Sequence, residues 1–284
     1  MEKWTRSGMA GLLGAASRSG CGFTPIVIVA MAGLALAGTR IGGASAMVGG
    51  AQPATTDVGR SVVMILGSHG TSSTACTASA IGRDLLLTAA HCVQPGADYK
   101  LVASKVGEAP VLKDIARIER KPQFDMKRLF GHLATADVAL IKLAEPLPAR
   151  IPPVRIGNET ESVAVGDTLV VVGYGDTVRG DGRTGGIVRA APLTVTGQPG
   201  NLQIRLVDPA TKGMRAGLGA CTGDSGAPAF RDEGGGFKVI GAVSWSTGPN
   251  LSAGCGGLTG ITPLVRYRAW TVETARLLGS PLAP

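Results

Sequence analysis

The sequence predicts an all-β protein made of short antiparallel strands, arranged as a sandwich or a barrel. Glycine supplies 43 of the 284 residues, and this content, without a three-residue repeat, disfavours long helices and suits strands joined by tight turns. Short apolar segments rich in valine and isoleucine alternate with turns that contain glycine and aspartate. Apolar residues recur at helical spacing only in residues 265–278, so we expect one helix near the C-terminus.

The expected strands follow one another along the chain, with turn signals between them. They cover residues 61–66, 84–88, 138–143, 168–172 and 237–245. The glycine run 234–236 is the expected tip of a hairpin that precedes the last of these strands. Residues 150–153 include two consecutive prolines, so we expect a linker there between an N-terminal domain, 47–153, and a C-terminal domain, 154–284.

Residues 1–46 are expected to be a secretory leader and not part of the fold. A basic segment that includes Lys3 and Arg6 is followed by the uncharged, largely apolar residues 25–38. The small residues 44–46 then suit a cleavage site. Because a membrane span needs ~20 apolar residues, we expect a periplasmic or secreted chain without stable membrane association after cleavage. A retained leader would instead act as an anchor.

The cysteines and the charge narrow the class of protein further. Of five cysteines, Cys21 lies in the leader, and the four that remain are Cys76, Cys92, Cys221 and Cys255. In an exported chain these predict two disulfides, for which spacing alone allows three pairings. The formal net charge is +8, but the basic residues are scattered without a run of four. We therefore expect a solvated surface and no nucleic-acid partner.

Three polar residues stand among small or apolar neighbours. His91 follows a Leu-Thr-Ala-Ala run, Asp137 precedes an apolar strand, and Ser225 lies in Gly-Asp-Ser-Gly. Each of them alone is most often structural, as a hydrogen-bonded core histidine or as a turn residue. Together they indicate nucleophilic catalysis, because a serine hydroxyl needs a base with a pKa near neutrality and the resulting imidazolium needs a carboxylate.

Three segments carry a resemblance to a known family. Residues 87–92 (LTAAHC), 136–143 (ADVALIKL) and 223–226 (GDSG) resemble, in order, the signature segments of trypsin/chymotrypsin-like serine proteases. The resemblance extends from Met47 to about Leu278. It implies two antiparallel six-stranded β-barrels with the active site in the cleft between them, and a C-terminal α-helix. The implied activity is hydrolysis of proteins or peptides by a monomer, with no cofactor and no metal.

The resemblance also implies a role for each residue of the site. Ser225 is the implied nucleophile, His91 its base, and Asp137 the carboxylate that holds and stabilises the imidazole. Ser244 is the implied hydrogen-bond donor to that carboxylate. The backbone N–H groups of Gly223 and Ser225 would form the oxyanion hole, and glycine at 223 suits the turn this requires.

Disulfide pairing and activation follow from the same resemblance. The implied pairs are Cys76–Cys92 and Cys221–Cys255. In this family a new N-terminal ammonium pairs with the Asp before the nucleophile, here Asp224. Cleavage after Ala46 would create that ammonium on Met47, so we predict that export itself activates the enzyme. Arg40-Ile41 also resembles an activation junction, but Ile41 starts six residues too early for the register of the first strand.

The specificity pocket is expected to be uncharged. The resemblance implies that Gly219, Ala220 and Ser246 wall this pocket, and none of them supplies a carboxylate for a basic substrate residue. Val243 stands where glutamate-specific relatives have histidine. We therefore expect a preference for small or medium apolar residues, although residues 254–263 depart from the family pattern. The alternatives are an inactive protease-like binding protein and an esterase that uses the same triad.

Overall fold

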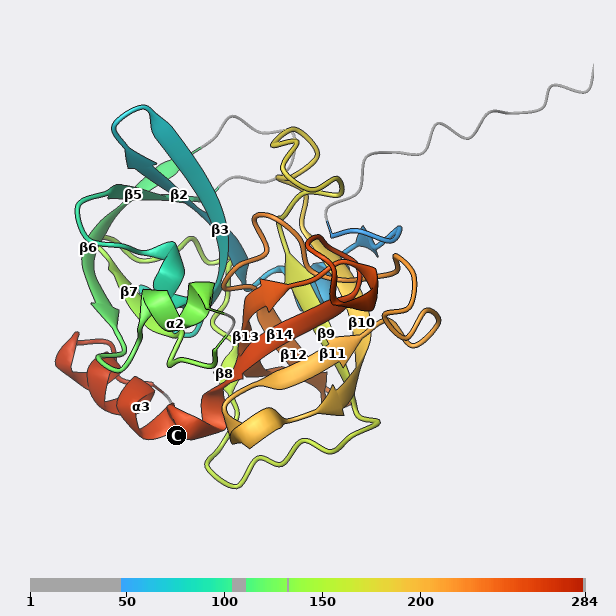
Figure 1. The fold of residues 1–284 in the computed structure, drawn as a ribbon. Helices are drawn as coiled ribbons and strands as arrows, with labels where there is room; N and C mark the ends of the chain where they lie inside the picture. Colours follow the sequence, from blue (N-terminus) through green and yellow to red (C-terminus); the bar gives the residue numbers. More distant parts are fainter. Residues whose placement is uncertain (1–46, 104–110, 132, 283–284) are drawn as a thin grey trace, which may run out of the picture. The chain divides into compact units, whose positions relative to one another are not determined.

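The computed structural model describes residues 47–103, 111–131 and 133–282, which form antiparallel strands joined by turns and loops (Figure 1). The first six main strands close into a barrel in the order β2-β3-β4-β7-β6-β5. Their bounds are β2 Val62–His69, β3 Ser72–Ala80, β4 Leu85–Thr88, β5 Asp98–Val102, β6 Leu112–Arg120 and β7 Ala139–Leu143. Alternate side chains fill the barrel, among them Ile65, Ala78, Leu86, Leu101 and Ile141, all at most 1% exposed.

A second ring of six strands follows in the chain. The pairing order is β9-β10-β11-β14-β13-β12, and β12 pairs back with β9, so this sheet also closes. The bounds are β9 Thr168–Gly173, β10 Arg189–Gly197, β11 Ile204–Val207, β12 Pro228–Asp232, β13 Phe237–Ser246 and β14 Leu258–Pro263. Short strands β1 (Gln52–Pro53) and β8 (Arg155–Ile156) add to β10 and β13. Its interior includes Leu169, Leu193, Leu206, Val243 and Ile261.

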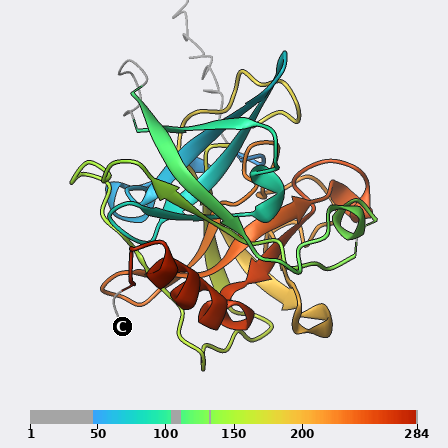
Figure 2. The ribbon, with the colours of Figure 1, turned by 90° about the vertical axis from the view of Figure 1, so that its left-hand side faces the viewer.

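Helices are few and short. The α-helices are α1 (Thr56–Gly59), α2 (Met126–Phe130) and α3 (Arg268–Leu277), and 3₁₀ turns cover Ala90–Cys92, Pro199–Asn201, Pro249–Leu251 and Leu264–Arg266. Figure 2 shows α3, in red, beside the blue and green strands of the first barrel. A third apolar cluster joins Leu85 and Leu140 of the first barrel to Phe230 of the second and Ala275 of α3. None of the described helices is long and apolar enough to cross a membrane.

The predicted fold class is confirmed. Each of the five expected strands overlaps an observed one (β2, β4, β7, β9 and β13), and the glycine run 234–236 lies between β12 and β13. The C-terminal helix is also observed, although a 3₁₀ turn replaces its expected first residues and α3 begins at Arg268. The expected leader, residues 1–46, lies outside the described residues.

Candidate active site

A histidine and a buried aspartate form the polar centre of the site. His91 lies in the 3₁₀ turn after β4, and Asp137 lies just before β7, which pairs with β4. Nδ1 of His91 lies 2.8 Å from Oδ2 of Asp137, and the backbone N–H of His91 donates to Oδ1 at 2.9 Å. Because a carboxylate only accepts hydrogen bonds, this contact suits the His91 tautomer that has its proton on Nδ1 and a free acceptor at Nε2.

Ser244 completes the hydrogen bonding of the Asp137 carboxylate. Its hydroxyl, near the end of β13, donates to Oδ2 of Asp137 at 2.5 Å. Asp137 is 0% exposed, and a buried carboxylate is tolerated only where hydrogen bonds replace its water shell. The first barrel therefore supplies the acid, and the second barrel supplies a donor that holds it.

The segment that carries Ser225 packs against the one that carries His91. The Ser225 carbonyl oxygen accepts a hydrogen bond from the N–H of Thr77 on β3 at 2.8 Å. A Cβ added to Gly226 would lie 2.9 Å from the backbone nitrogen of Ala89, two residues before His91. Among the described residues the Ser225 hydroxyl forms no hydrogen bond with His91, which is common in sites without substrate.

The same segment also lies beside the partner of Asp137. The Gly226 N–H donates to the carbonyl oxygen of Val243 at 2.8 Å, and Val243 directly precedes Ser244. The backbone that follows Ser225 is therefore bonded to the residue next to the one that binds Asp137. The three polar residues singled out from the sequence belong to one hydrogen-bonded neighbourhood built from both barrels.

Two backbone donors beside the serine are unpaired. Within the described part of the chain, the N–H groups of Gly223 and Ser225 donate no hydrogen bond, whereas those of Asp224 and Gly226 donate to backbone carbonyl oxygens. Gly223 has a φ of 92°, in the left-handed region that favours glycine. Free N–H groups at alternate positions around a nucleophile are suited to stabilising an oxyanion.

Two disulfides restrain these segments. The bonded pairs are Cys76 with Cys92 and Cys221 with Cys255, the pairings that the resemblance implies. Cys92 directly follows His91, and Cys221 lies four residues before Ser225, so each crosslink holds a segment of the site. Cys76, His91 and Cys92 also bring three possible metal-ligand atoms within 4.8 Å of one another. Both sulfurs are bonded to each other, and a disulfide lacks the thiolates that bind metals.

Asp224 is buried without a cationic partner. Its two carboxylate oxygens accept hydrogen bonds from the N–H groups of Gly175 and Cys221, each at 2.9 Å. No cation from the described residues lies within ion-pair distance of it. Burial raises the pKa of Asp224 to about 7 against the opposing effect of these hydrogen bonds, and the nearby Asp176 adds to the rise. A cation at this place would favour the charged form and lower that pKa.

Met47 lies close to the same loop. It is 0% exposed and belongs to the core of the second barrel. The N–H of Val48 donates to the carbonyl oxygen of Gly219 at 3.2 Å, two residues before Cys221. The first described residue therefore already occupies a buried position beside the segment that leads to Asp224.

The residues expected to wall a specificity pocket meet at Thr259. The N–H of Ala220 donates to Oγ1 of Thr259 at 3.0 Å, and Ser246 pairs with Thr259 between β13 and β14. A Cβ added to Gly219 would lie 3.4 Å from that same oxygen. Residues 254–263, which depart from the family pattern, contain β14. The pairing of β14 with β11 and β13 places this segment beside the expected pocket. Of these four residues, none is charged.

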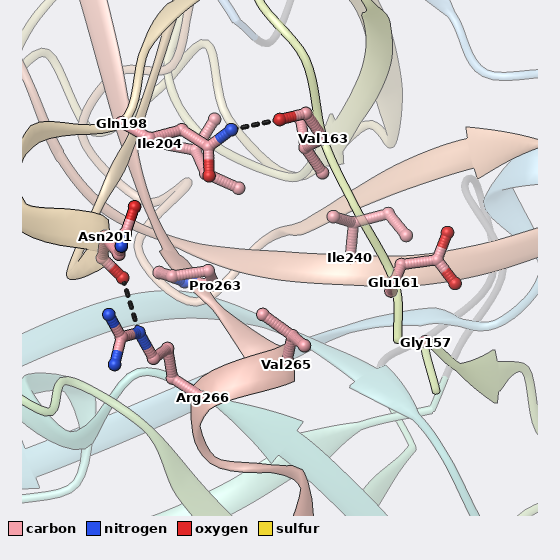
Figure 3. Close-up of a pocket in the computed structure, with 10 residues that line it drawn as sticks. All are labelled: Gly157, Glu161, Val163, Gln198, Asn201, Ile204, Ile240, Pro263, Val265 and Arg266. Atoms are coloured by element: carbon pink, nitrogen blue, oxygen red, sulfur yellow. Dashed lines mark hydrogen bonds between the residues drawn. The ribbon is translucent and has the colours of Figure 1, made fainter. Parts of the chain in front are cut away.

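Two cavities need to be distinguished. One, of about 560 Å³, is lined by His91 and Ser244 together with residues of β11, β13, β14 and the α2 segment. The other, of about 240 Å³, lies on the second barrel and shares no lining residue with the first (Figure 3). In the second cavity Arg266 donates to the Asn201 carbonyl oxygen at 2.9 Å, and Glu161 pairs with Lys238 at 2.9 Å. The cavity lined by His91 and Ser244 is therefore the one that borders the candidate active site.

One contributor to the site was missed by sequence reasoning. The buried Thr77 hydroxyl donates to the carbonyl oxygen of Gly223 at 2.9 Å and accepts from the N–H of Tyr174 at 3.1 Å. Thr88 in turn donates to the Thr77 carbonyl oxygen at 2.8 Å. Thr77 thus bonds β3 of the first barrel to the loop that carries Ser225. Its only signal in the sequence is its place directly after Cys76.

Two closed β-barrels, with a histidine, a buried aspartate and a serine segment gathered between them, define the class of chymotrypsin-like serine proteases. A comparison with protein families agrees with this class. The model of the trypsin family matches residues 47–271. Since this match covers most of the chain, the chain belongs to the trypsin family of serine proteases.

Proposed function

We propose that the chain is an exported serine endopeptidase that cleaves proteins or peptides through an acyl-enzyme on Ser225. The observation that supports this best is the hydrogen-bonded series from His91 through Asp137 to Ser244, packed against the Ser225 segment. Nε2 of His91 takes the proton of the Ser225 hydroxyl while the oxygen attacks the scissile carbonyl carbon. Asp137 keeps the imidazole in the required tautomer and stabilises its cation.

The remaining steps use groups already described. The N–H groups of Gly223 and Ser225 donate to the oxyanion as the tetrahedral intermediate forms. His91 then returns the proton to the leaving amine, and the C–N bond breaks to leave an ester on Ser225. A water molecule, deprotonated by His91, hydrolyses this ester and restores the free serine. Residues 47–153 and 154–284 act as the two halves of a monomer that needs no cofactor.

Activation is proposed to accompany export to the periplasm or the medium. Cleavage after Ala46 leaves an ammonium on Met47, and this cation pairs with Asp224. The support is the buried Asp224 carboxyl, which no cation of the described residues approaches, and the buried position of Met47 beside the segment that leads to it. Charge neutralisation removes the cost of a lone buried carboxylate. N-terminal sequencing of the exported protein is expected to start at Met47, and a start at Ile41 would contradict the proposal.

The primary specificity pocket is proposed to be uncharged. Gly219, Ala220 and Ser246 surround Thr259, and none of these four residues carries a charge to pair with a basic or acidic substrate residue. Small or medium apolar residues are therefore the expected choice before the scissile bond. Profiling cleavage sites in a peptide library tests this preference directly.

Active-site labelling tests the catalytic proposal. The exported protein is expected to react with a fluorophosphonate and to degrade unfolded proteins, whereas Ser225→Ala does neither and loses on the order of 10⁶ in kcat. The exposed Ser68→Ala variant serves as a control and keeps both properties. Absence of labelling would favour an inactive binding protein. Labelling and ester turnover without any proteolysis would favour an esterase.

A further inference from the structure

The cavity of about 560 Å³ beside His91 has an apolar rim that the proposed chemistry does not use. Phe130 at the end of α2 is 76% exposed, Leu133 is 53% exposed, and Leu251 of the 3₁₀ turn Pro249–Leu251 is 71% exposed. All three line this cavity. Single exposed apolar residues are ordinary, but several around one concavity mark a place where apolar groups bind.

Two polar side chains line the same cavity from the β11 segment. Gln203 and Arg205 are two residues apart, so their side chains lie on the same face of the strand. The alternate residues Ile204 and Leu206 lie on the other face and belong to the core of the second barrel. Gln203 is only 8% exposed, yet within the described residues its amide makes no hydrogen bond. The amide faces the open cavity, so water satisfies it in the free protein, and a substrate that displaces this water can take its place.

Arg205 gives the cavity its charge. The guanidinium forms no ion pair or hydrogen bond with any residue that the structure describes. In contrast, the polar side chains Arg266 and Glu161 of the cavity in Figure 3 are engaged with the protein itself. An unpaired guanidinium at the edge of an apolar site attracts a carboxylate, for which its planar donors are well matched.

We propose that this cavity selects substrates with a bulky apolar side chain and an acidic side chain in the segment that precedes the scissile bond. The inference rests on the proposed endopeptidase function. Ser246 belongs both to the expected primary pocket and to this cavity, so the polypeptide that enters that pocket continues into the cavity. The apolar side chain lies among Phe130, Leu133 and Leu251, the carboxylate pairs with Arg205, and the Gln203 amide bonds to the substrate.

The test measures binding and cleavage separately. Fluorescent peptides carry phenylalanine at successive positions before an alanine cleavage site, with Glu, Gln or Lys at a neighbouring position. Binding is measured by polarisation to the exported Ser225→Ala protein, and kcat/KM is measured with Ser225 present. The glutamate peptide is expected to bind about threefold to tenfold more tightly than the lysine peptide, as for a partly exposed ion pair.

Variants assign the preference to single residues. Arg205→Glu is expected to reverse it, so that the lysine peptide binds more tightly. Arg83→Glu is the matched control, because Arg83 is also exposed and does not line the cavity, and it leaves the preference unchanged. Gln203→Leu is expected to weaken all three peptides about equally while keeping or raising the melting temperature, since a purely structural glutamine would lower it when replaced.

The outcomes separate this inference from the proposed function. Cleavage of all three peptides at equal kcat/KM, with equal binding to Ser225→Ala, overturns the inference while the endopeptidase function stands. Preferential binding that Arg205→Glu reverses, in a protein that cleaves nothing, supports the selectivity of the cavity and overturns the endopeptidase function. If the Arg205→Glu variant still prefers the glutamate peptide over the lysine peptide, Arg205 does not pair with the substrate carboxylate.

Discussion

Asp137 illustrates how single residues determine the chemistry of this site. Its carboxylate is fully buried and accepts hydrogen bonds from the His91 backbone, from the His91 ring and from the Ser244 hydroxyl. These three donors replace the water that burial removes. Because these donors bond both carboxylate oxygens, they also hold the carboxylate in one orientation toward the imidazole.

Replacing the carboxylate by an amide tests this arrangement. In Asp137→Asn the amide oxygen keeps the bond from the His91 backbone N–H, so the N–H₂ replaces Oδ2 and faces both the His91 ring and Ser244. The favoured histidine tautomer then moves its proton to Nε2, and the base is lost. We expect kcat to fall by roughly 10³ to 10⁴ at neutral pH. The control is Asp98→Asn at an exposed position on β5, and it retains kcat. Unchanged kcat in a folded Asp137→Asn protein would remove this residue from the mechanism.

At the scale of elements, the serine segment is held by close backbone contacts. Gly226 has a φ of 79°, and a Cβ there would meet Thr88, Thr77 and Ala89 of the first barrel. Strand β3 contributes two further bonds through Thr77, to the carbonyl oxygens of Ser225 and Gly223. The Ser225 segment is thus held across the barrel interface, and its position depends on the absence of a side chain at 226.

Adding one methyl group tests this contact. Gly226→Ala is expected to lower the free energy of unfolding by at least about 2 kcal/mol, because it combines a left-handed backbone with a clash. Gly235→Ala is the matched control at the hairpin tip, where a Cβ would meet nothing within 4 Å, and its change stays within about 0.5 kcal/mol. Urea unfolding followed by tryptophan fluorescence measures both. Equal stability of the two variants would contradict the close approach.

At the scale of the whole molecule, the proposed cleavage after Ala46 would link processing to stability through Asp224. Before that cleavage, burial raises the pKa of Asp224 to about 7, well above the ~3.9 of an unfolded aspartate. Between these values the folded state binds a proton that the unfolded state lacks. Stability from this group is therefore complete at low pH and is lost as the pH rises toward 7.

The pH dependence of unfolding tests this link. The unprocessed chain, refolded with its disulfides, is expected to lose up to about 4 kcal/mol between pH 4 and 7 through this group. After cleavage, the Met47 ammonium pairs with Asp224, so the exported protein shows a flatter profile over the same range. Unfolding free energies of the two forms, measured from pH 4 to 8, show whether the exported protein has the flatter profile. Parallel profiles would argue against the ion pair.

Local patterns in the sequence were enough to predict part of the fold. The strands β4 and β7 are runs of apolar residues, and α3 repeats its apolar residues at helical spacing, so each is visible in a short window. Strands β3 and β6 were not singled out, because β3 consists mostly of small and polar residues and β6 has charged residues at five of its nine positions. Their strand state comes from pairing with neighbours in a closed barrel.

The sequence by itself determined the all-β class, the family and the motif residues His91, Asp137 and Ser225, because these depend on composition and on short segments. The tertiary structure decided what lies between distant segments, such as the bond from Thr77 to Gly223 across 146 positions. It likewise brought Gln203 and Arg205 to the cavity beside His91. No local pattern encodes such contacts, since they exist only once both barrels have closed and packed together.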